Sequence, residues 1–132
     1  MKRLIGFTAV LVVLFLSNSV FAEDLTFEVN GKKYEAEKSD LPGYYNWADA
    51  KAGCDRLVTE DTNDDWFLPS KDELNAMYEQ LHKKAVGGFA NFYYWSSSEN
   101  VSNYAWGQDF YNGYLYGNHR VDRNYVRCIR AL

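Results

Sequence analysis

The chain has 132 residues, of which 14 are Lys or Arg and 18 are Asp or Glu, and its formal net charge is -4. Such a length fits one small domain and leaves no room for a second. The acidic balance argues against a nucleic-acid binder, because affinity for phosphate backbones comes mainly from Lys and Arg side chains.

The N-terminus has the order of a secretory signal peptide. Lys2 and Arg3 precede an apolar run over residues 4–16, and Ala22 offers a small residue at the cut. The run is shorter than the roughly 20 residues of a bilayer-spanning helix, which argues against a membrane anchor. We therefore expect residues 1–22 to be removed and the mature chain to be periplasmic or secreted, without insertion into a membrane.

A β-hairpin is predicted over residues 25–36. Apolar and polar residues alternate there and lead into Asn30-Gly31, the dipeptide best suited to a two-residue hairpin turn. With a linker, this hairpin makes up residues 23–43 and precedes the main domain at residues 44–132.

Two amphipathic helices are predicted next. Asn46 can cap the first, and Ser70 with Glu73 forms a capping box for the second, which Gly87-Gly88 ends or follows. Apolar residues recur at helical spacing on both, namely Trp47, Ala50, Cys54 and Leu57 on the first and Leu74, Met77, Tyr78 and Leu81 on the second.

The last forty residues have strand character and are crowded with Tyr, Trp, Asn, Ser and Gly. Helices and strands are thus segregated along the chain, which predicts the α+β class. Rigid aromatic rings combined with adaptable polar side chains are typical of recognition surfaces such as antibody paratopes. We therefore expect this region to bind a ligand.

A two-residue turn at Asn112-Gly113 would pair Tyr111 with Tyr114 and Asp109 with Tyr116. Strand alternation then gives two faces. The face predicted to be buried carries Trp106, Gln108, Phe110 and Leu115, and the face predicted to be exposed carries Asp109, Tyr111, Tyr114, Tyr116 and Asn118. The alternative for these tyrosines is cross-strand packing that only stabilises the sheet.

Cys54 and Cys128 are the two cysteines, and in an exported chain we interpret them as one disulfide. A free catalytic thiol or a metal-binding pair is the competing interpretation. It is disfavoured because neither cysteine has a His or a second Cys at ligand spacing.

Several motifs follow one another in a characteristic order: Trp66-Phe67-Leu68-Pro69-Ser70, Tyr94-Trp95-Ser96-Ser97-Ser98, Ala105-Trp106, Phe110, Asn112-Gly113 and Val126-Arg127-Cys128. This order resembles the Lcl C-terminal domain family, exported bacterial domains named after a collagen-like adhesin and similar to the C-type lectin-like fold. The resemblance spans roughly residues 44 to 132 and implies a single C-type lectin-like domain whose disulfide joins the first helix to the last strand.

The same pattern is similar to the variable proteins of diversity-generating retroelements, in which exposed positions vary around a fixed framework. That resemblance implies framework roles for Trp66, Pro69, Trp95, Ser96, Ser97, Trp106, Phe110, Gly113, Val126 and Arg127. Together with the exposed strand face, it gives a candidate ligand-binding set of Asn103, Tyr104, Asp109, Tyr111, Tyr114, Tyr116, Asn118, His119, Arg120 and Tyr125.

No catalytic residues are predicted. Ser96 to Ser98 lack a nucleophile elbow, and no glycine-rich phosphate loop is present. The formylglycine-generating enzymes share a related fold, but their activity needs a dedicated cysteine pair. His82 and His119 are expected to be solvated surface residues and not general bases.

No cofactor or metal ligand is predicted either, although calcium is worth weighing. Asp61, Asn63, Asp65 and Asp72 imitate the ligands of an EF-hand loop. The position that requires glycine in such a loop holds Trp66, so we interpret the acidic run as solvated.

Arg120, Arg123, Arg127 and Arg130 accompany the aromatic residues and could hold a sulfate or carboxylate of a glycan, although Arg127 could instead be a structural partner of the acidic half. The sequence thus predicts an exported, non-catalytic module, adhesin-like or lectin-like, that binds a glycan or a protein. The alternative is a structural or assembly protein of the envelope that uses the same surface for permanent self- or partner association.

Overall fold

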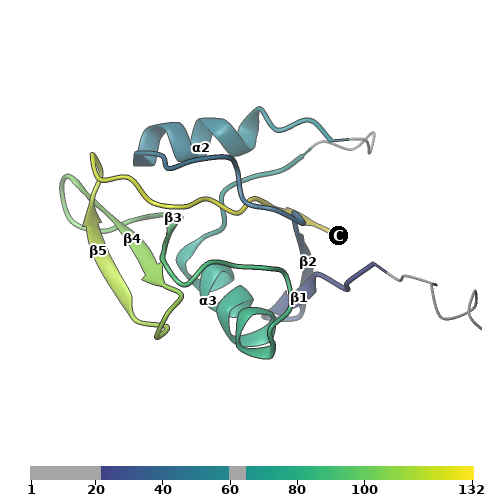
Figure 1. Ribbon diagram of the computed structural model, residues 1–132. Coiled ribbons are helices and arrows are strands. Elements are labelled where there is room, and N and C mark those ends of the chain that lie inside the picture. The colour runs from purple at the N-terminus through teal and green to yellow at the C-terminus, as the bar shows by residue number, and fades with distance from the viewer. Residues whose placement is uncertain (1–21, 60–64) are drawn as a thin grey trace, which may run out of the picture.

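The computed structural model describes residues 22–59 and 65–132, so the predicted signal peptide lies outside the described residues except for Ala22. Across these two segments, two antiparallel three-stranded sheets, ordered β1-β2-β6 and β3-β4-β5, combine with two α-helices, which confirms the α+β class. The elements are β1 Thr26–Val29, β2 Lys32–Ala36, α2 Trp47–Asp55, α3 Lys71–Gln80, the 3-10 helix η2 His82–Lys84, β3 Tyr93–Glu99, β4 Tyr104–Asp109, β5 Leu115–His119 and β6 Ile129–Ala131 (Figure 1).

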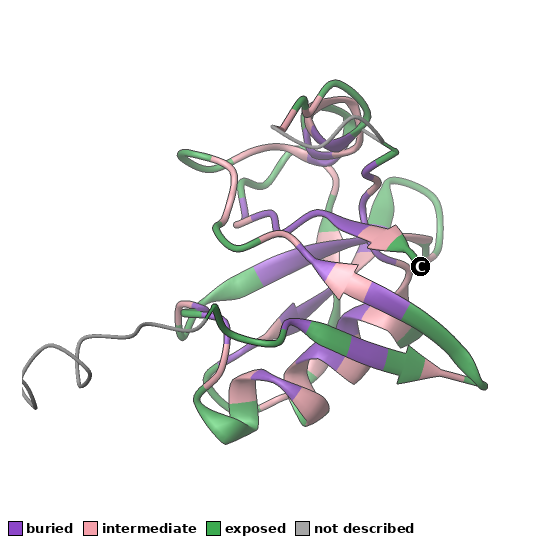
Figure 2. Ribbon diagram, turned by 90° about the vertical axis from the view of Figure 1, so that its right-hand side faces the viewer, coloured by how far each residue is buried: buried purple, intermediate pink, exposed green. Residues whose placement is uncertain are grey.

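The predicted N-terminal hairpin is confirmed. Val29 pairs with Lys32 across a two-residue turn in which Asn30 and Gly31 have φ angles of 51° and 80°. Both φ angles are positive, as the tight hairpin turn requires. Buried and exposed residues alternate along β1 (Figure 2). β2 also pairs with β6, so the hairpin and the C-terminal strand form one sheet.

Both predicted helix caps are present. The Asn46 side chain accepts a hydrogen bond from the Asp49 backbone N–H at 2.9 Å. Ser70 accepts from the Glu73 N–H at 3.2 Å, while the Glu73 carboxylate accepts from the Ser70 N–H at 2.8 Å. Each cap satisfies backbone donors that the first helical turn leaves free, so the two helices begin where the sequence predicts.

The core has two parts that lie on opposite faces of β3. One part joins α3 to both sheets and is built from Leu25, Phe27, Tyr34, Ala36, Leu74, Met77, Leu81, Phe89, Tyr94, Phe110 and Ile129. The other part packs α2 on the sheet through Trp47, Ala50, Cys54, Trp66, Leu68, Trp95, Ala105, Val126 and Cys128. Within it the Cys54–Cys128 disulfide is formed, as predicted, with the two Cα atoms 5.5 Å apart.

The predicted two-residue turn at Asn112-Gly113 is wrong. β4 and β5 pair Gln108 with Leu115 and Gly107 with Tyr116, so the connection is longer. The Asp109 N–H donates to the Tyr114 carbonyl at 2.9 Å and the Gly113 N–H donates to the Asp109 carbonyl at 2.6 Å, so residues 110–113 form a four-residue turn. The register differs from the predicted one by two residues, which leaves each side chain on its predicted face.

Burial on those two faces departs from the prediction at four positions. On the face predicted to be buried, Gln108 and Phe110 are buried as expected, whereas Trp106 and Leu115 are only half-buried. The indole of Trp106 is covered by the Lys71 ammonium, 3.8 Å from the ring centroid, and not by core residues. On the other face Asp109 and Asn118 are half-buried because neighbouring side chains flank them, while Tyr111, Tyr114 and Tyr116 are exposed.

The Tyr94 side chain connects the core to the segment after β2. Its ionisation is expected to make the stability of the protein depend on pH. Its hydroxyl donates to Asp40 at 2.9 Å and accepts from the Ala90 N–H at 2.8 Å. Burial, followed by the charge of Asp40, raises the pKa of Tyr94 well above its ordinary value of 10.0. A pKa raised in the folded state gives stability that is present below the unfolded pKa and is lost as the pH rises above it.

We therefore expect the free energy of unfolding to fall as the pH rises from about 10. In urea titrations, Tyr94→Phe should be destabilised by about 1 to 3 kcal/mol at neutral pH, because Ala90 and Asp40 lose their partner. Its alkaline decline should be shallower than that of the wild type. An equally steep decline in both proteins would contradict the role of Tyr94.

Candidate functional site

Four residues on one face of the β3-β4-β5 sheet form a cluster that we call the tyrosine patch: Tyr93 on β3, Asp109 on β4, Tyr116 on β5, and Tyr114 just before β5. Tyr93 pairs with Asp109 across β3 and β4. The ring of Tyr116 lies 6.0 Å from that of Tyr93 and 6.2 Å from that of Tyr114, measured between centroids. Three of the four belong to the predicted ligand-binding set, and the structure brings them together.

The strand register explains why these rings are both exposed and fixed. Further along the same sheet face, Trp95 and Ala105 are fully buried beneath α2. The patch lies beyond this covered part, where Tyr93 and Tyr116 remain 40% exposed and Tyr114 remains 63% exposed. The sheet therefore holds large aromatic surfaces in place without burying them.

Gly107 leaves space over β4 that the Asn118 side chain fills. It is the β4 residue opposite both Trp95 on β3 and Tyr116 on β5. A side chain at this position would stand between the two outer strands, which lie about 10 Å apart. The amide nitrogen of Asn118 occupies this space, 2.6 Å from where a Cβ of residue 107 would be.

The patch offers hydrogen-bonding groups as well as aromatic surface. Asp109 is half-buried, and its Oδ1 accepts from the Tyr111 backbone N–H at 2.9 Å, which fixes the carboxylate. Partial burial, followed by the neighbouring Tyr93 and Asp109, raises the pKa of the Tyr116 hydroxyl above 10.0. That hydroxyl is therefore protonated at neutral pH and can donate a hydrogen bond.

Four other predicted residues gather at the opposite end of β4 and β5. Tyr104 pairs with His119, and their rings are 5.0 Å apart. The Arg120 backbone N–H donates to the Asn103 carbonyl at 2.9 Å, and its side-chain Nε donates to the Tyr104 carbonyl at 3.2 Å. Arg120 also lies 4.4 Å from the ring centroid of Trp47, so this second group is joined to α2.

The remaining predicted residues lie apart from both groups. Tyr125 forms an isolated β-bridge with Tyr94 of β3. Its ring centroid lies 5.0 Å from that of Tyr44 and 5.5 Å from that of Phe92, on the other face of the sheet from Tyr93. Tyr111 is 74% exposed in the β4–β5 connection. Sequence reasoning missed Tyr93, whose place on the same face as Trp95 follows from strand alternation once β3 is known.

The set of arginines predicted to hold an anion is not assembled. Arg127 is 1% exposed and forms an ion pair with Asp40 at 2.7 Å, which confirms the structural alternative. Arg130 lies 2.8 Å from the carboxylate of Glu35. Because these groups are paired at separate places, they do not form one basic surface with Arg120.

The prediction that His82 is a solvated surface residue is wrong, whereas His119 is exposed as expected. The Nε2 of His82 lies 2.9 Å from Asn91 Oδ1 and 2.8 Å from the Phe110 carbonyl oxygen. Its ring also stacks on Phe110, with centroids 5.2 Å apart. His82 is half-buried because it anchors η2 to the β4–β5 connection.

The predicted framework residues are mostly internal. Trp95 Nε1 donates to the Tyr45 carbonyl at 2.6 Å, and Ser96 Oγ donates to the Trp106 carbonyl at 2.6 Å. Gly113 has a φ angle of 86°, and a Cβ there would lie 2.6 Å from the Tyr78 ring. A side chain at Gly113 would therefore both strain the backbone and collide with α3.

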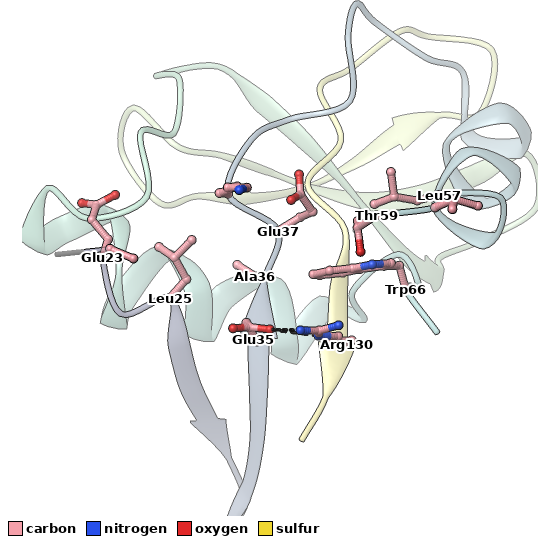
Figure 3. A pocket seen from close by; sticks show the side chains of 12 residues that line it. Glu23, Leu25, Glu35, Ala36, Glu37, Leu57, Thr59, Trp66 and Arg130 are labelled. Atoms are coloured by element: carbon pink, nitrogen blue, oxygen red, sulfur yellow. Dashed lines mark hydrogen bonds and ion pairs between the residues drawn. The ribbon is translucent and has the colours of Figure 1, made fainter. Parts of the chain in front are cut away.

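A separate hollow of about 730 Å³ lies beside the β1-β2-β6 sheet (Figure 3). Glu35 and Arg130 form an ion pair at its edge, and Trp66 and Leu57 help to line it. It adjoins Thr59, the last described residue before position 65. None of the ten predicted ligand-binding residues lines this hollow.

The described residues contain neither a metal-binding cluster nor a membrane-spanning helix. Over residues 22–59 and 65–132, no group of three or more His, Cys, Asp or Glu side chains could hold a metal ion. Asp61 and Asn63, two of the four residues that imitate the ligands of an EF-hand loop, lie outside the described residues. In the same two segments, no helix has the length and apolar character needed to cross a membrane.

Comparison with known families gives one result that covers most of the chain. The family model for the Lcl C-terminal domain matches residues 23–130. The match begins at residue 23 and so includes the N-terminal hairpin, whereas the resemblance seen in the sequence begins near residue 44. No curated protein matches the chain.

Proposed function

The chain belongs to the Lcl C-terminal domain family, and from this premise we propose that it is an exported, non-catalytic module that binds a ligand on the tyrosine patch. The disulfide is compatible with a periplasmic or extracellular location. Its place between α2 and the segment before β6 supports the inferred likeness to C-type lectin-like domains. The proposed partner is a glycan or a protein outside the cytoplasm, and not a nucleic acid or a membrane.

The exposure of the tyrosine rings is the observation that carries this proposal. A large aromatic side chain contributes most to stability when it is buried, yet Tyr114 is 63% exposed and Tyr116 is 40% exposed on a well-packed sheet. Clustered aromatic rings on a rigid element are typical of recognition surfaces, since little conformational entropy is lost when they bind.

The chemistry of the patch supports binding without catalysis. It contains one carboxylate, Asp109, and three phenol groups. Such groups donate and accept hydrogen bonds and stack on a ligand. The patch has no histidine, lysine or cysteine, the side chains that most often act as general bases or nucleophiles.

A glycan array tests the proposal, with the protein expressed from the full-length gene and purified in its oxidised form. We expect selective binding that is weakened by about tenfold or more in Tyr114→Ala/Tyr116→Ala, because both stacking surfaces are lost. Tyr44→Ala is the matched control, since Tyr44 is 58% exposed but belongs to the group around Tyr125. Binding should be equal with calcium and with a chelator.

Binding that survives the double substitution would contradict the proposal, and an array without any binding would contradict a glycan ligand and leave a protein ligand or an assembly role. Permanent association through the same patch would then be favoured if sedimentation revealed a stable oligomer that dissociates in Tyr114→Ala/Tyr116→Ala.

A further inference from the structure

The negative charge of Asp109 indicates which class of glycan the tyrosine patch binds. This inference rests on the proposed function. We propose that the patch selects an uncharged sugar, with Asp109 accepting hydrogen bonds from ligand hydroxyls, and that it disfavours sulfated or carboxylated glycans. The argument depends on the position of Asp109, on where the arginines lie, and on the chemistry of a pyranose ring.

Asp109 is the charged residue of the patch and is held in place from within its own chain. It lies directly opposite Tyr93 in the β3–β4 ladder, and its Oδ1 is engaged by the Tyr111 N–H. Among the described residues no hydrogen-bond donor is assigned to its Oδ2. That oxygen can accept from a ligand, and a hydrogen bond to a carboxylate is about twice as strong as one between neutral groups.

Three of the four arginines predicted to hold an anion are held elsewhere, and the fourth, Arg123, is exposed. Arg120 lies at the opposite end of β4 and β5, against Trp47. Arg127 is buried on Asp40, and Arg130 pairs with Glu35 in the other sheet. A sulfate or carboxylate placed on the tyrosine patch would therefore meet the charge of Asp109 without an opposite charge from these side chains, and like charges that meet at an interface disfavour binding.

A neutral sugar fits the same groups. The C–H surface of a pyranose ring packs on exposed aromatic rings, which Tyr114 and Tyr116 present side by side. The hydroxyls of the sugar donate to the carboxylate of Asp109, while the phenol hydroxyls of the patch both donate and accept. The patch thus combines apolar stacking with directional hydrogen bonds and uses no ionic contact.

The experiment uses an array of matched glycans printed side by side: N-acetyllactosamine with its 6-sulfated and sialylated forms. We expect the neutral member to bind more tightly than its sulfated or sialylated form by about tenfold or more. Raising NaCl from about 50 to about 500 mM should leave neutral binding nearly unchanged, because no ion pair is made.

Asp109→Asn should weaken binding of the neutral glycan by about tenfold and reduce the discrimination against its sulfated form. The amide keeps an oxygen for the Tyr111 N–H, so the loop is preserved. Asp49→Asn on α2 is the control, since it makes the same change of charge at an exposed position away from the patch.

The two proposals fail in different ways. Preferential binding of the sulfated or sialylated forms that depends on Tyr114 and Tyr116 would overturn the inference on charge and leave the binding function intact. The same holds if Asp109→Asn and Asp49→Asn behave alike. No glycan binding at all would overturn the inference of a sugar ligand. Glycan binding that is independent of Tyr114 and Tyr116 would overturn the proposed function itself.

Discussion

Replacing Arg127 by methionine is expected to lower the free energy of unfolding by about 3 to 5 kcal/mol. The guanidinium is 1% exposed and pairs with Asp40 at 2.7 Å. It also donates to the carbonyl oxygens of Glu37 at 3.1 Å and Gly87 at 2.8 Å. Methionine fills a similar volume but leaves the Asp40 charge and these carbonyls without their donor, which is the costly way to break a buried ion pair.

Arg127 matters because it joins the glycine turn after η2 to the two segments that continue the β2–β6 pair. Its guanidinium also lies 4.0 Å from the ring centroid of Phe89, so the chain after β2, the glycine turn after η2 and the approach to β6 meet at one side chain. Urea unfolding followed by tryptophan fluorescence measures the loss. Arg120→Met is the matched control: Arg120 is partly exposed, and its loss should cost less than about 1 kcal/mol.

A loss below about 1 kcal/mol for Arg127→Met would contradict this structural role. The double variant Arg127→Met/Asp40→Asn separates the ion pair from packing. Since it removes both charges, it should be less destabilised than the sum of the two single variants.

Cys128→Ser should destabilise the protein by about 4 to 5 kcal/mol, the largest single effect together with that of Arg127. The disulfide joins residues separated by 74 positions, so it restricts much of the unfolded chain. Both cysteines are buried in the part of the core that packs α2 on the sheet, together with Trp47 and Trp95. Loss of the bridge therefore also places a hydroxyl in an apolar region.

Unfolding of the oxidised wild type, the reduced wild type and Cys54→Ala/Cys128→Ala measures this effect. The last two should agree closely, since both lack the bridge and neither introduces a buried hydroxyl. Two thiols that react freely in the native protein, or equal stability of the oxidised and reduced forms, would contradict the assignment.

Features that depend on near neighbours in the sequence could be predicted. The Asn30-Gly31 turn, the Asn46 cap and the Ser70–Glu73 capping box were each predicted from a few adjacent residues and are confirmed. These local signals fix φ angles or satisfy backbone donors over one turn of chain, so no distant contact is needed to decide them.

Features decided by distant contacts could not be predicted in the same way. The β4–β5 register differs from the predicted one by two residues, and the contact between Tyr93 and Tyr116 depends on how three strands align. The partner of Arg127 lies 87 positions away in the sequence. For the same reason the ten predicted ligand-binding residues proved to be several groups, because alternation along one hairpin does not reveal where its two ends lie.

Calorimetric titration of the strongest neutral glycan from the array into the wild type, Tyr116→Ala and Tyr44→Ala tests the central claim most directly. Binding at the tyrosine patch predicts an affinity about tenfold or more lower for Tyr116→Ala and within about twofold of the wild type for Tyr44→Ala. Equal affinities in all three proteins, or a loss confined to Tyr44→Ala, would contradict the assignment of the tyrosine patch as the ligand-binding surface.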